Sequence, residues 1–328
     1  MKAATKRALV LSGGGGRGAY HVGALTYLQN VDWHPDIIIG TSVGALNAAT
    51  LGSGIPVSGL RDRWLDLETA DIQKMRADDV FIDNMVRGGK HIFDTTPFLK
   101  TALGRNEKWS GRPWIIPEIL NGPHAPYEVW ITAVDLEERA LVYFTNRGEE
   151  EIPPEAVRAS FSIPLWYEPT IIDHRPHVDG GTLANTPFRK ALELGATEVV
   201  VVVLTPWPGR PARTWKTSRL PWIDDELLAI PQRLWTAFEP ALDMMLTEMA
   251  WRDYLLFERE RRAGEHAQLD WLRVVSPEVP PPVGLMTNYL RDNHIRLYRR
   301  GEKDARALLH DLLGRGSRAS AKEVRGPR

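Results

Sequence analysis

A serine set between an apolar strand and a helix constrains this chain more than any other feature. Ser42 lies at the centre of G-T-S-V-G (Gly40–Gly44), directly after the branched apolar run Ile37–Ile39 and before the alanine-rich stretch Ala45–Ala49. G-x-S-x-G in this context is typical of a nucleophile elbow, a strained turn that presents the serine hydroxyl. The helix that follows directs its free N–H groups and positive dipole end toward the serine. The pattern predicts a serine nucleophile; an ordinary strand–helix turn with a bystander serine is the alternative.

A glycine-rich loop lies upstream of the serine. An apolar run leads into S-G-G-G-G-R-G (Ser12–Gly18), and helix-like sequence follows. Gly13, Gly15 and Gly18 fit the dinucleotide-binding pattern G-x-G-x-x-G, but the second strand ends in the serine turn, where that fold needs an acidic residue. The loop can instead present backbone N–H groups to an oxyanion. Because successive strand–helix units of a parallel sheet place their loops at the same carboxyl edge, we expect the two loops to lie side by side.

A third motif, V-D-G-G (Val178–Gly181), places Asp179 before two glycines. Alone, this motif is typical of a turn. A serine nucleophile needs a base, however, and a Ser-His-Asp triad on a doubly wound hydrolase fold needs a histidine late in the chain. The late candidates, His266, His294 and His310, lie in charged or helix-like sequence. We therefore expect them to be solvated rather than catalytic.

Together, the three motifs resemble those of the patatin-like phospholipase family. That family has a G-G-G-x-R/K-G oxyanion loop, a G-x-S-x-G elbow and a D-G-G/A motif, in the order and rough spacing found here. The resemblance covers about residues 7–205, and the runs Ala159–Pro164 and Asn185–Pro187 match the family's usual surroundings. It implies a three-layer α/β/α sandwich with a mostly parallel central sheet. The implied activity is hydrolysis of fatty-acyl esters of phospholipids, lysophospholipids or acylglycerols.

The resemblance also implies roles for individual residues. Ser42 is the implied nucleophile and Asp179 its base, forming a Ser–Asp dyad in which a partly apolar site raises the aspartate pKa. The implied oxyanion donors are the amides of Gly14, Gly15, Gly16 and Val43; the other motif residues are Gly13, Arg17, Gly18, Gly40, Gly44, Gly180 and Gly181. For the Arg17 side chain, three roles stay open: steadying the loop, meeting a substrate phosphate, or forming a surface salt bridge.

Other functions stay open as alternatives. A lipid acyltransferase uses an alcohol rather than water to resolve the acyl-enzyme. A catalytically idle binding or regulatory protein and a Rossmann nucleotide binder are the others. We expect no metal and no cofactor, because the chain has no cysteine, no H-E-x-x-H and no clustered carboxylate loop.

Composition limits the partners and the compartment. The 328-residue chain has a formal net charge of −1, which argues against nucleic-acid binding. Its basic start, Met1–Arg7, is followed by an apolar run too short for a signal peptide, and no stretch is long enough for a membrane span. We therefore expect a cytoplasmic protein, peripheral at the membrane where it meets lipid. Oligomeric state cannot be predicted.

The chain divides by composition. Residues 1–205 are the expected catalytic core, residues 206–313 a lid or loop and a helical part that complete the same domain, and residues 314–328 a basic disordered tail. Within the core, alternating β-branched sequence predicts a strand pair over 127–134 and 140–144.

Two apolar features lie beyond the core. Trp207, Trp215 and Trp222 stand among prolines and cations, which suits transient contact with a membrane surface or a lid; tryptophans folded back on the core are the alternative. Residues 226–262 are expected to form a helix with a buried apolar face that consists of Leu234, Trp235, Phe238, Leu242, Met245, Leu246 and Met249.

Overall fold

The computed structural model describes residues 4–75, 92–148, 151–208, 232–278 and 288–313. Their main sheet has eight strands: β1 (Arg7–Leu11), β2 (Ile37–Gly40), β5 (Glu128–Asp135), β6 (Ala140–Thr145), β7 (Thr170–Ile172), β8 (Arg175–Asp179), β9 (Glu198–Val202) and β10 (Trp271–Val275). A separate antiparallel pair consists of β3 (Lys74–Met75) and β4 (Phe93–Asp94). The short helices are η1 (Gly15–Arg17), α4 (Thr69–Ile72), α6 (Thr96–Ala102), α7 (Pro117–Leu120), α8 (Pro154–Ser160), α9 (Gly181–Ala184) and α10 (Phe188–Glu193). The longer helices are α1 (Ala19–Asn30), α2 (Val43–Gly52), α3 (Val57–Asp66), α11 (Gln232–Arg262) and α12 (Arg291–Leu313).

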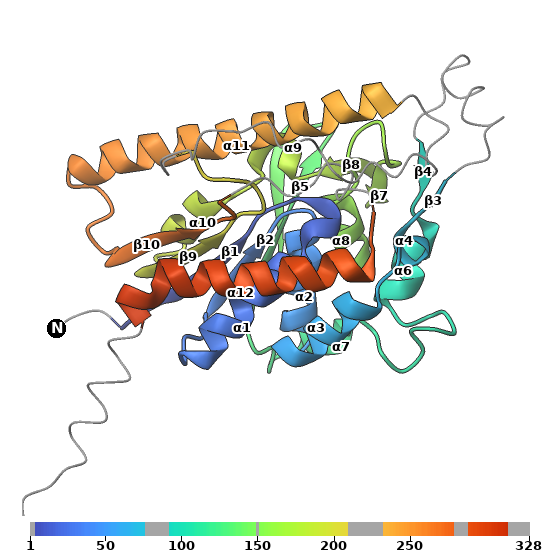
Figure 1. Ribbon diagram of the computed structural model, residues 1–328, viewed down its shortest axis with the longest axis horizontal. Coiled ribbons are helices and arrows are strands. Elements are labelled where there is room, and N and C mark those ends of the chain that lie inside the picture. The colour runs from blue at the N-terminus through green and yellow to red at the C-terminus, as the bar shows by residue number, and fades with distance from the viewer. Residues whose placement is uncertain (1–3, 76–91, 149–150, 209–231, 279–287, 314–328) are drawn as a thin grey trace, which may run out of the picture.

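The sheet is mixed but mostly parallel, with helices on both faces (Figure 1). Its order is β10-β9-β1-β2-β5-β8-β7, and β6 pairs with β5 off this path. Strands β10, β9, β1, β2 and β5 are parallel, whereas β6, β7 and β8 are antiparallel to their neighbours. This confirms the predicted α/β sandwich, and the strand pair β5–β6 forms where the alternating sequence predicted it.

The apolar strands are buried on both faces, which explains their near-continuous apolar sequences. Alternate residues of β1 enter different core clusters: Leu9 and Leu11 face α1, α2 and α12, whereas Ala8 and Val10 face α10 and α11. Helices α11 and α12 accordingly lie on opposite faces of the sheet (Figure 1). Residues beyond 205 thus contribute an edge strand and one helix to each face.

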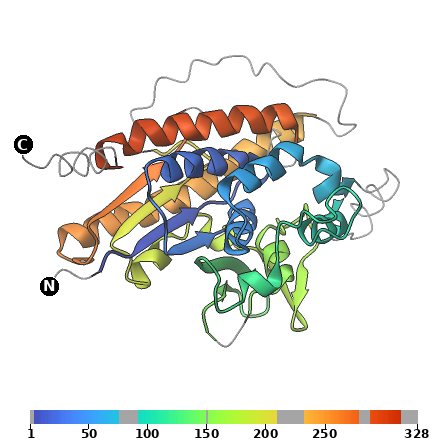
Figure 2. The ribbon, with the colours of Figure 1, turned by 90° about the horizontal axis from the view of Figure 1, so that it is seen from below.

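Helix α12 runs along α1 (Figure 2) at a very short distance. A Cβ atom added at Gly23 would come within 1.9 Å of the Tyr298 carbonyl oxygen, and one added at Gly301 within 2.0 Å of the Tyr20 carbonyl oxygen. Only glycine permits this approach. Because α1 begins directly after the glycine-rich loop, the α1–α12 contact anchors the helix that carries that loop.

Strand register places the serine and the aspartate at the same height on the sheet. Gly40, the last residue of β2, pairs with Ile131 of β5. Ala133, two residues further along β5, pairs with Asp179 at the end of β8. Ser42 follows Gly40 by two residues. Because β5 lies between β2 and β8, the serine motif and the aspartate motif stand at the same level on its two sides.

The apolar features beyond the core differ from expectation. Trp207 is only 8% exposed and packs on Trp251 and Tyr254 of α11, so it cannot insert into a membrane and instead folds back on the core. Met245 of the expected buried stripe is 63% exposed, whereas Leu242 and Leu246 pack against the core. The other two expected membrane contacts, Trp215 and Trp222, lie outside the described residues, as does the expected disordered tail 314–328. No helix of the described residues is long and apolar enough to cross a bilayer.

Candidate active site

Ser42 occupies a strained turn between β2 and α2. Its backbone angles are φ 55° and ψ −124°, a region that non-glycine residues rarely adopt and that clusters at functional sites. The flanking glycines are required by close packing: a Cβ at Gly40 would come within 2.4 Å of the Gly44 carbonyl oxygen, and one at Gly44 within 2.2 Å of the Leu11 carbonyl oxygen. The turn thus has the geometry of the predicted nucleophile elbow.

The glycine-rich loop lies directly beside this turn. A Cβ at Gly13 would stand 3.0 Å from the Ser42 Cβ, so the two loops touch as the parallel sheet predicted. The Gly13 N–H donates to the Asn185 carbonyl at 3.1 Å, which fixes the start of the loop. Among the described residues, the amides of Gly14, Gly15 and Gly16 meet no hydrogen-bond acceptor. They can therefore donate to an oxyanion. The N–H of Val43, the first residue of α2, follows Ser42 directly and is a further donor beside the loop.

Asp179 ends β8 with its carboxylate beside the Ser42 side chain. The Gly181 N–H donates to Oδ1 at 2.6 Å. The residue is only 6% exposed. Burial raises the pKa of Asp179 from 3.8 to about 7, because desolvation outweighs the opposing hydrogen bonds from Gly181 and Ser42. A carboxyl group with this pKa can exchange a proton near neutral pH.

An apolar pocket lies beside Ser42. It is bounded by Gly15 and Ser42 together with Val43, Leu46, Ile72, Phe98, Phe161, Ile163, Tyr167 and Tyr289. Its free volume is about 10 Å³, close to the space that one water molecule needs. The pocket is therefore narrow in this structure.

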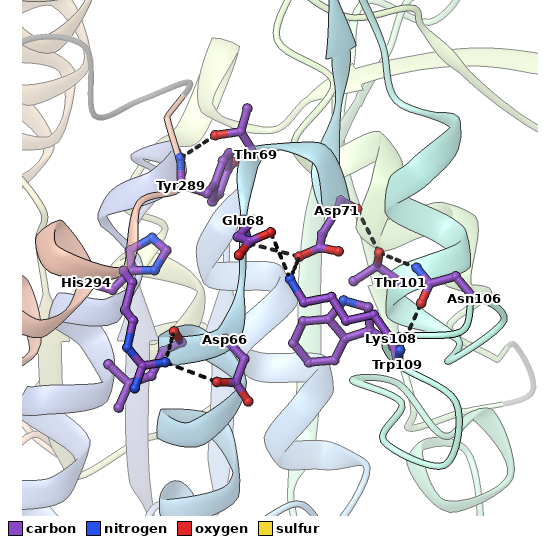
Figure 3. A network of polar contacts seen from close by, with 12 residues as sticks. Asp66, Glu68, Thr69, Asp71, Thr101, Asn106, Lys108, Trp109, Tyr289 and His294 are labelled. Carbon is purple, nitrogen blue, oxygen red and sulfur yellow. Dashed lines mark hydrogen bonds and ion pairs between the residues drawn. The ribbon is translucent and has the colours of Figure 1, made fainter. Parts of the chain in front are cut away.

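A polar network holds one wall of this pocket in place (Figure 3). Lys108 Nζ lies 2.7 Å from Asp71 Oδ2 and 3.3 Å from Glu68 Oε2, which ties α4 to the segment after α6. The Tyr289 N–H donates to Thr69 Oγ1 at 3.0 Å. Since Ile72 of α4 and Tyr289 both line the pocket, the network sets the distance between these two parts of the wall.

Arg17 lies inside the protein rather than at the surface. It is fully buried, and its Nη1 donates to Asp243 Oδ1 of α11 at 2.8 Å. A buried guanidinium engaged by a carboxylate cannot meet a substrate phosphate in this state, and the expected surface salt bridge is replaced by a buried one. Of the roles left open by the sequence, steadying the loop fits best.

The late histidines are not joined to Ser42. His294 is fully buried, contrary to the expected solvated position; its Nδ1 lies 2.6 Å from the Trp64 carbonyl, and burial lowers its pKa to about 4. His310 is solvated as predicted. His266 precedes β10 and so lies at the amino ends of the parallel strands, whereas Ser42 lies at their carboxyl ends.

His266 also belongs to the group of described residues whose spacing could hold a metal ion, together with Glu260 and Glu265. Its Nε2 lies 3.0 Å from Glu260 Oε2, and Glu260 also pairs with Arg189 at 2.6 Å. These groups already satisfy one another, so the cluster has the character of an ion-pair network.

Sequence reasoning gave no role to several residues around the site. Ser160 Oγ accepts the Ser42 N–H at 2.9 Å, and the Ser162 carbonyl accepts the Asp179 N–H at 3.0 Å. In the sequence, the run Ala159–Pro164 matches only the usual surroundings of the aspartate motif. No spacing rule links it to Ser42, because the contact depends on how α8 packs against the sheet.

Known proteins share features with this chain. Residues 9–192 match the model of a family described as Patatin-like phospholipase, a span that includes both Ser42 and Asp179. Among solved structures, the chain is similar to the crystal structure of VipD from Legionella pneumophila. The TM-score is 0.46 at 14% sequence identity, covering 94% of this chain and 67% of that one.

Proposed function

Because the chain belongs to the patatin-like phospholipase family, whose members are lipid acyl hydrolases in general, we propose that it cleaves fatty-acyl esters with a Ser42–Asp179 dyad. The observation that carries this proposal is the position of the Ser42 side chain beside a buried carboxylate whose pKa is raised to about 7. No histidine joins this pair among the described residues, which supports a dyad over a triad.

In the proposed reaction, the Asp179 carboxylate accepts the Ser42 hydroxyl proton while Oγ attacks the ester carbonyl carbon. The negative charge that develops on the carbonyl oxygen is stabilised by the amides of Gly14, Gly15, Gly16 and Val43. Protonated Asp179 then gives its proton to the leaving alcohol. A water molecule then attacks the acyl carbon while Asp179 accepts its proton. The acyl–Oγ bond breaks, the fatty acid is released, and Asp179 returns the proton to Ser42 Oγ.

The proposed substrates are phospholipids, lysophospholipids or acylglycerols. The apolar lining of the pocket beside Ser42 supports an acyl chain as the group bound there. Transient contact with a lipid surface is part of the proposal, carried by Trp215 and Trp222 without the buried Trp207.

Hydrolysis of a lipid panel by purified protein tests the proposal. We expect Ser42→Ala and Asp179→Asn each to abolish release of fatty acid, by about 10³-fold or more, while the proteins stay folded. Asp135→Asn is a matched control. Asp135 is equally buried, on the neighbouring strand, but pairs with Arg175 and His177 rather than with Ser42.

Labelling with a fluorophosphonate probe gives a second readout, since it requires an activated serine. Full hydrolysis by Asp179→Asn would reject the dyad, and absent labelling of the wild-type Ser42 would favour an idle binding protein. Acyl transfer to an added alcohol in excess of fatty-acid release would identify an acyltransferase instead.

A further inference from the structure

One short segment touches the backbones of both residues of the proposed dyad. Ser160, the last residue of α8, accepts the Ser42 N–H on its Oγ at 2.9 Å. Two residues later, the Ser162 carbonyl accepts the Asp179 N–H at 3.0 Å. Ser160 is fully buried and Ser162 is 1% exposed, so water does not compete with these contacts.

The Ser42 contact acts on a strained residue. The left-handed φ of 55° at Ser42 persists only if its surroundings hold it. The acceptor that satisfies the buried backbone N–H of Ser42 is Ser160 Oγ. Removing this acceptor leaves a buried donor that can be satisfied only if the turn relaxes.

The segment is itself well anchored. Ser162 Oγ donates to the Arg158 carbonyl at 2.9 Å and lies 3.0 Å from Thr170 Oγ1 of β7. Phe161 and Ile163, which alternate with the two serines along this segment, line the apolar pocket. The same few residues therefore contact the nucleophile, the base and the pocket wall.

We propose that Ser160 is a positioning residue, whose hydroxyl holds the Ser42 turn so that Oγ stays against Asp179. The inference rests on the proposed function, since it concerns the geometry of the same dyad. Ser160 is not among the residues that line the apolar pocket. It acts through the Ser42 backbone, and Ser162 acts in parallel through the Asp179 backbone.

Steady-state kinetics on Ser160→Ala, Ser160→Thr and Ser53→Ala test the proposal. For Ser160→Ala, we expect kcat to fall by about 10- to 100-fold with KM nearly unchanged, because misplacement of the nucleophile slows chemistry rather than binding. Ser160→Thr keeps the hydroxyl and should recover most of that loss. Ser53→Ala is the matched control: Ser53 is also buried and its Oγ accepts a backbone N–H, from Ile116 at 2.9 Å, but it lies at the far end of α2 from Ser42, so we expect kcat within about threefold of wild type.

Thermal unfolding of each variant, and the rate of fluorophosphonate labelling, complete the design. Equal kcat values for folded Ser160→Ala and Ser53→Ala would overturn the inference. If Ser160→Ala does not fold, the labelling rate of Ser160→Cys decides, because sulfur keeps the size but accepts hydrogen bonds weakly. A slowed rate supports the inference, and a wild-type rate overturns it. Hydrolysis that survives Ser42→Ala would instead overturn the proposed function.

Discussion

At the scale of single residues, the carboxyl group of Asp179 is under two opposing influences. Desolvation favours its neutral form, whereas the Gly181 N–H and the Ser42 hydroxyl favour its ionised form. Desolvation dominates, and the pKa of about 7 leaves the group half ionised at neutral pH. A serine hydroxyl is a very weak acid, so a base with a raised pKa suits it better than an ordinary carboxylate.

This pKa predicts how activity depends on pH. The proposed base must be ionised in the free enzyme, so kcat/KM should rise about tenfold per pH unit below about pH 7 and level off above it. Measurement with a soluble ester from about pH 5 to 9 checks this. A profile that is flat down to pH 5 would contradict a base of this kind.

At the scale of elements, the glycine-rich loop is tied to a helix far along the sequence. Arg17 of η1 forms an ion pair with Asp243 of α11. Removing one partner of such a buried pair lowers the stability of the fold, because the other charge loses its counterion. The amides proposed as oxyanion donors precede Arg17 directly. A displacement of α11 would therefore move the Arg17 side chain and, with it, the loop that carries these amides.

We expect Asp243→Asn to lower both stability and kcat. The buried guanidinium would keep its charge without the Asp243 carboxylate, at a cost of about 1–3 kcal/mol, and the loop would be held less firmly. Urea unfolding and ester hydrolysis measure the two effects.

Glu248→Gln is the control for this prediction, because Glu248 lies on the same helix but pairs with Arg252 at the surface. Exposed pairs of this kind contribute about 0–1 kcal/mol. If the two variants behaved alike, the tie between α11 and the loop would have no measurable effect.

Helix α11 also shows where sequence periodicity stops being informative. Its apolar residues recur at helical spacing, which correctly predicted a helix, but Met244 and Met245 are 67% and 63% exposed. Helical periodicity identifies the apolar face of a helix. It does not show how much of that face the rest of the protein covers. The burial of His294 has the same origin: its charged neighbours suggested solvent, whereas Trp64 and Tyr289 pack around its ring.

At the scale of the whole molecule, the buried carboxylate has a stability cost. Asp179 is protonated in the folded protein up to about pH 7, but in the unfolded chain only up to about pH 3.8. Between these values the folded state binds more protons, so its stability falls as pH rises. The cost is complete above pH 7, where both states are ionised.

Asp179→Asn removes this cost. At about pH 8 we expect the variant to be more stable than wild type by on the order of 4 kcal/mol, and the difference should vanish at about pH 4. Urea unfolding across this range isolates the effect, because all other groups are shared. Parallel pH curves for the two proteins would mean that Asp179 is not desolvated.

Sequence predicted the sheet and the site unequally. Apolar strands and glycine loops predicted the parallel sheet and the meeting of the glycine-rich loop with the Ser42 turn, since both follow from local pattern and chain order. The hydrogen bond of Ser160 to Ser42 and the ion pair of Arg17 with Asp243 join residues more than a hundred positions apart. Such contacts depend on side-chain packing between layers, which no motif encodes.

The central position of β1 has a consequence for any shortened form of the protein. β1 lies between β2 and β9, and β9 begins at Glu198, after the last residue of the family match. A fragment cut at residue 192 would leave the polar backbone groups of Arg7–Leu11 unpaired along one side. An apolar strand uncovered in this way readily recruits strands from other molecules, so such a fragment would aggregate rather than fold.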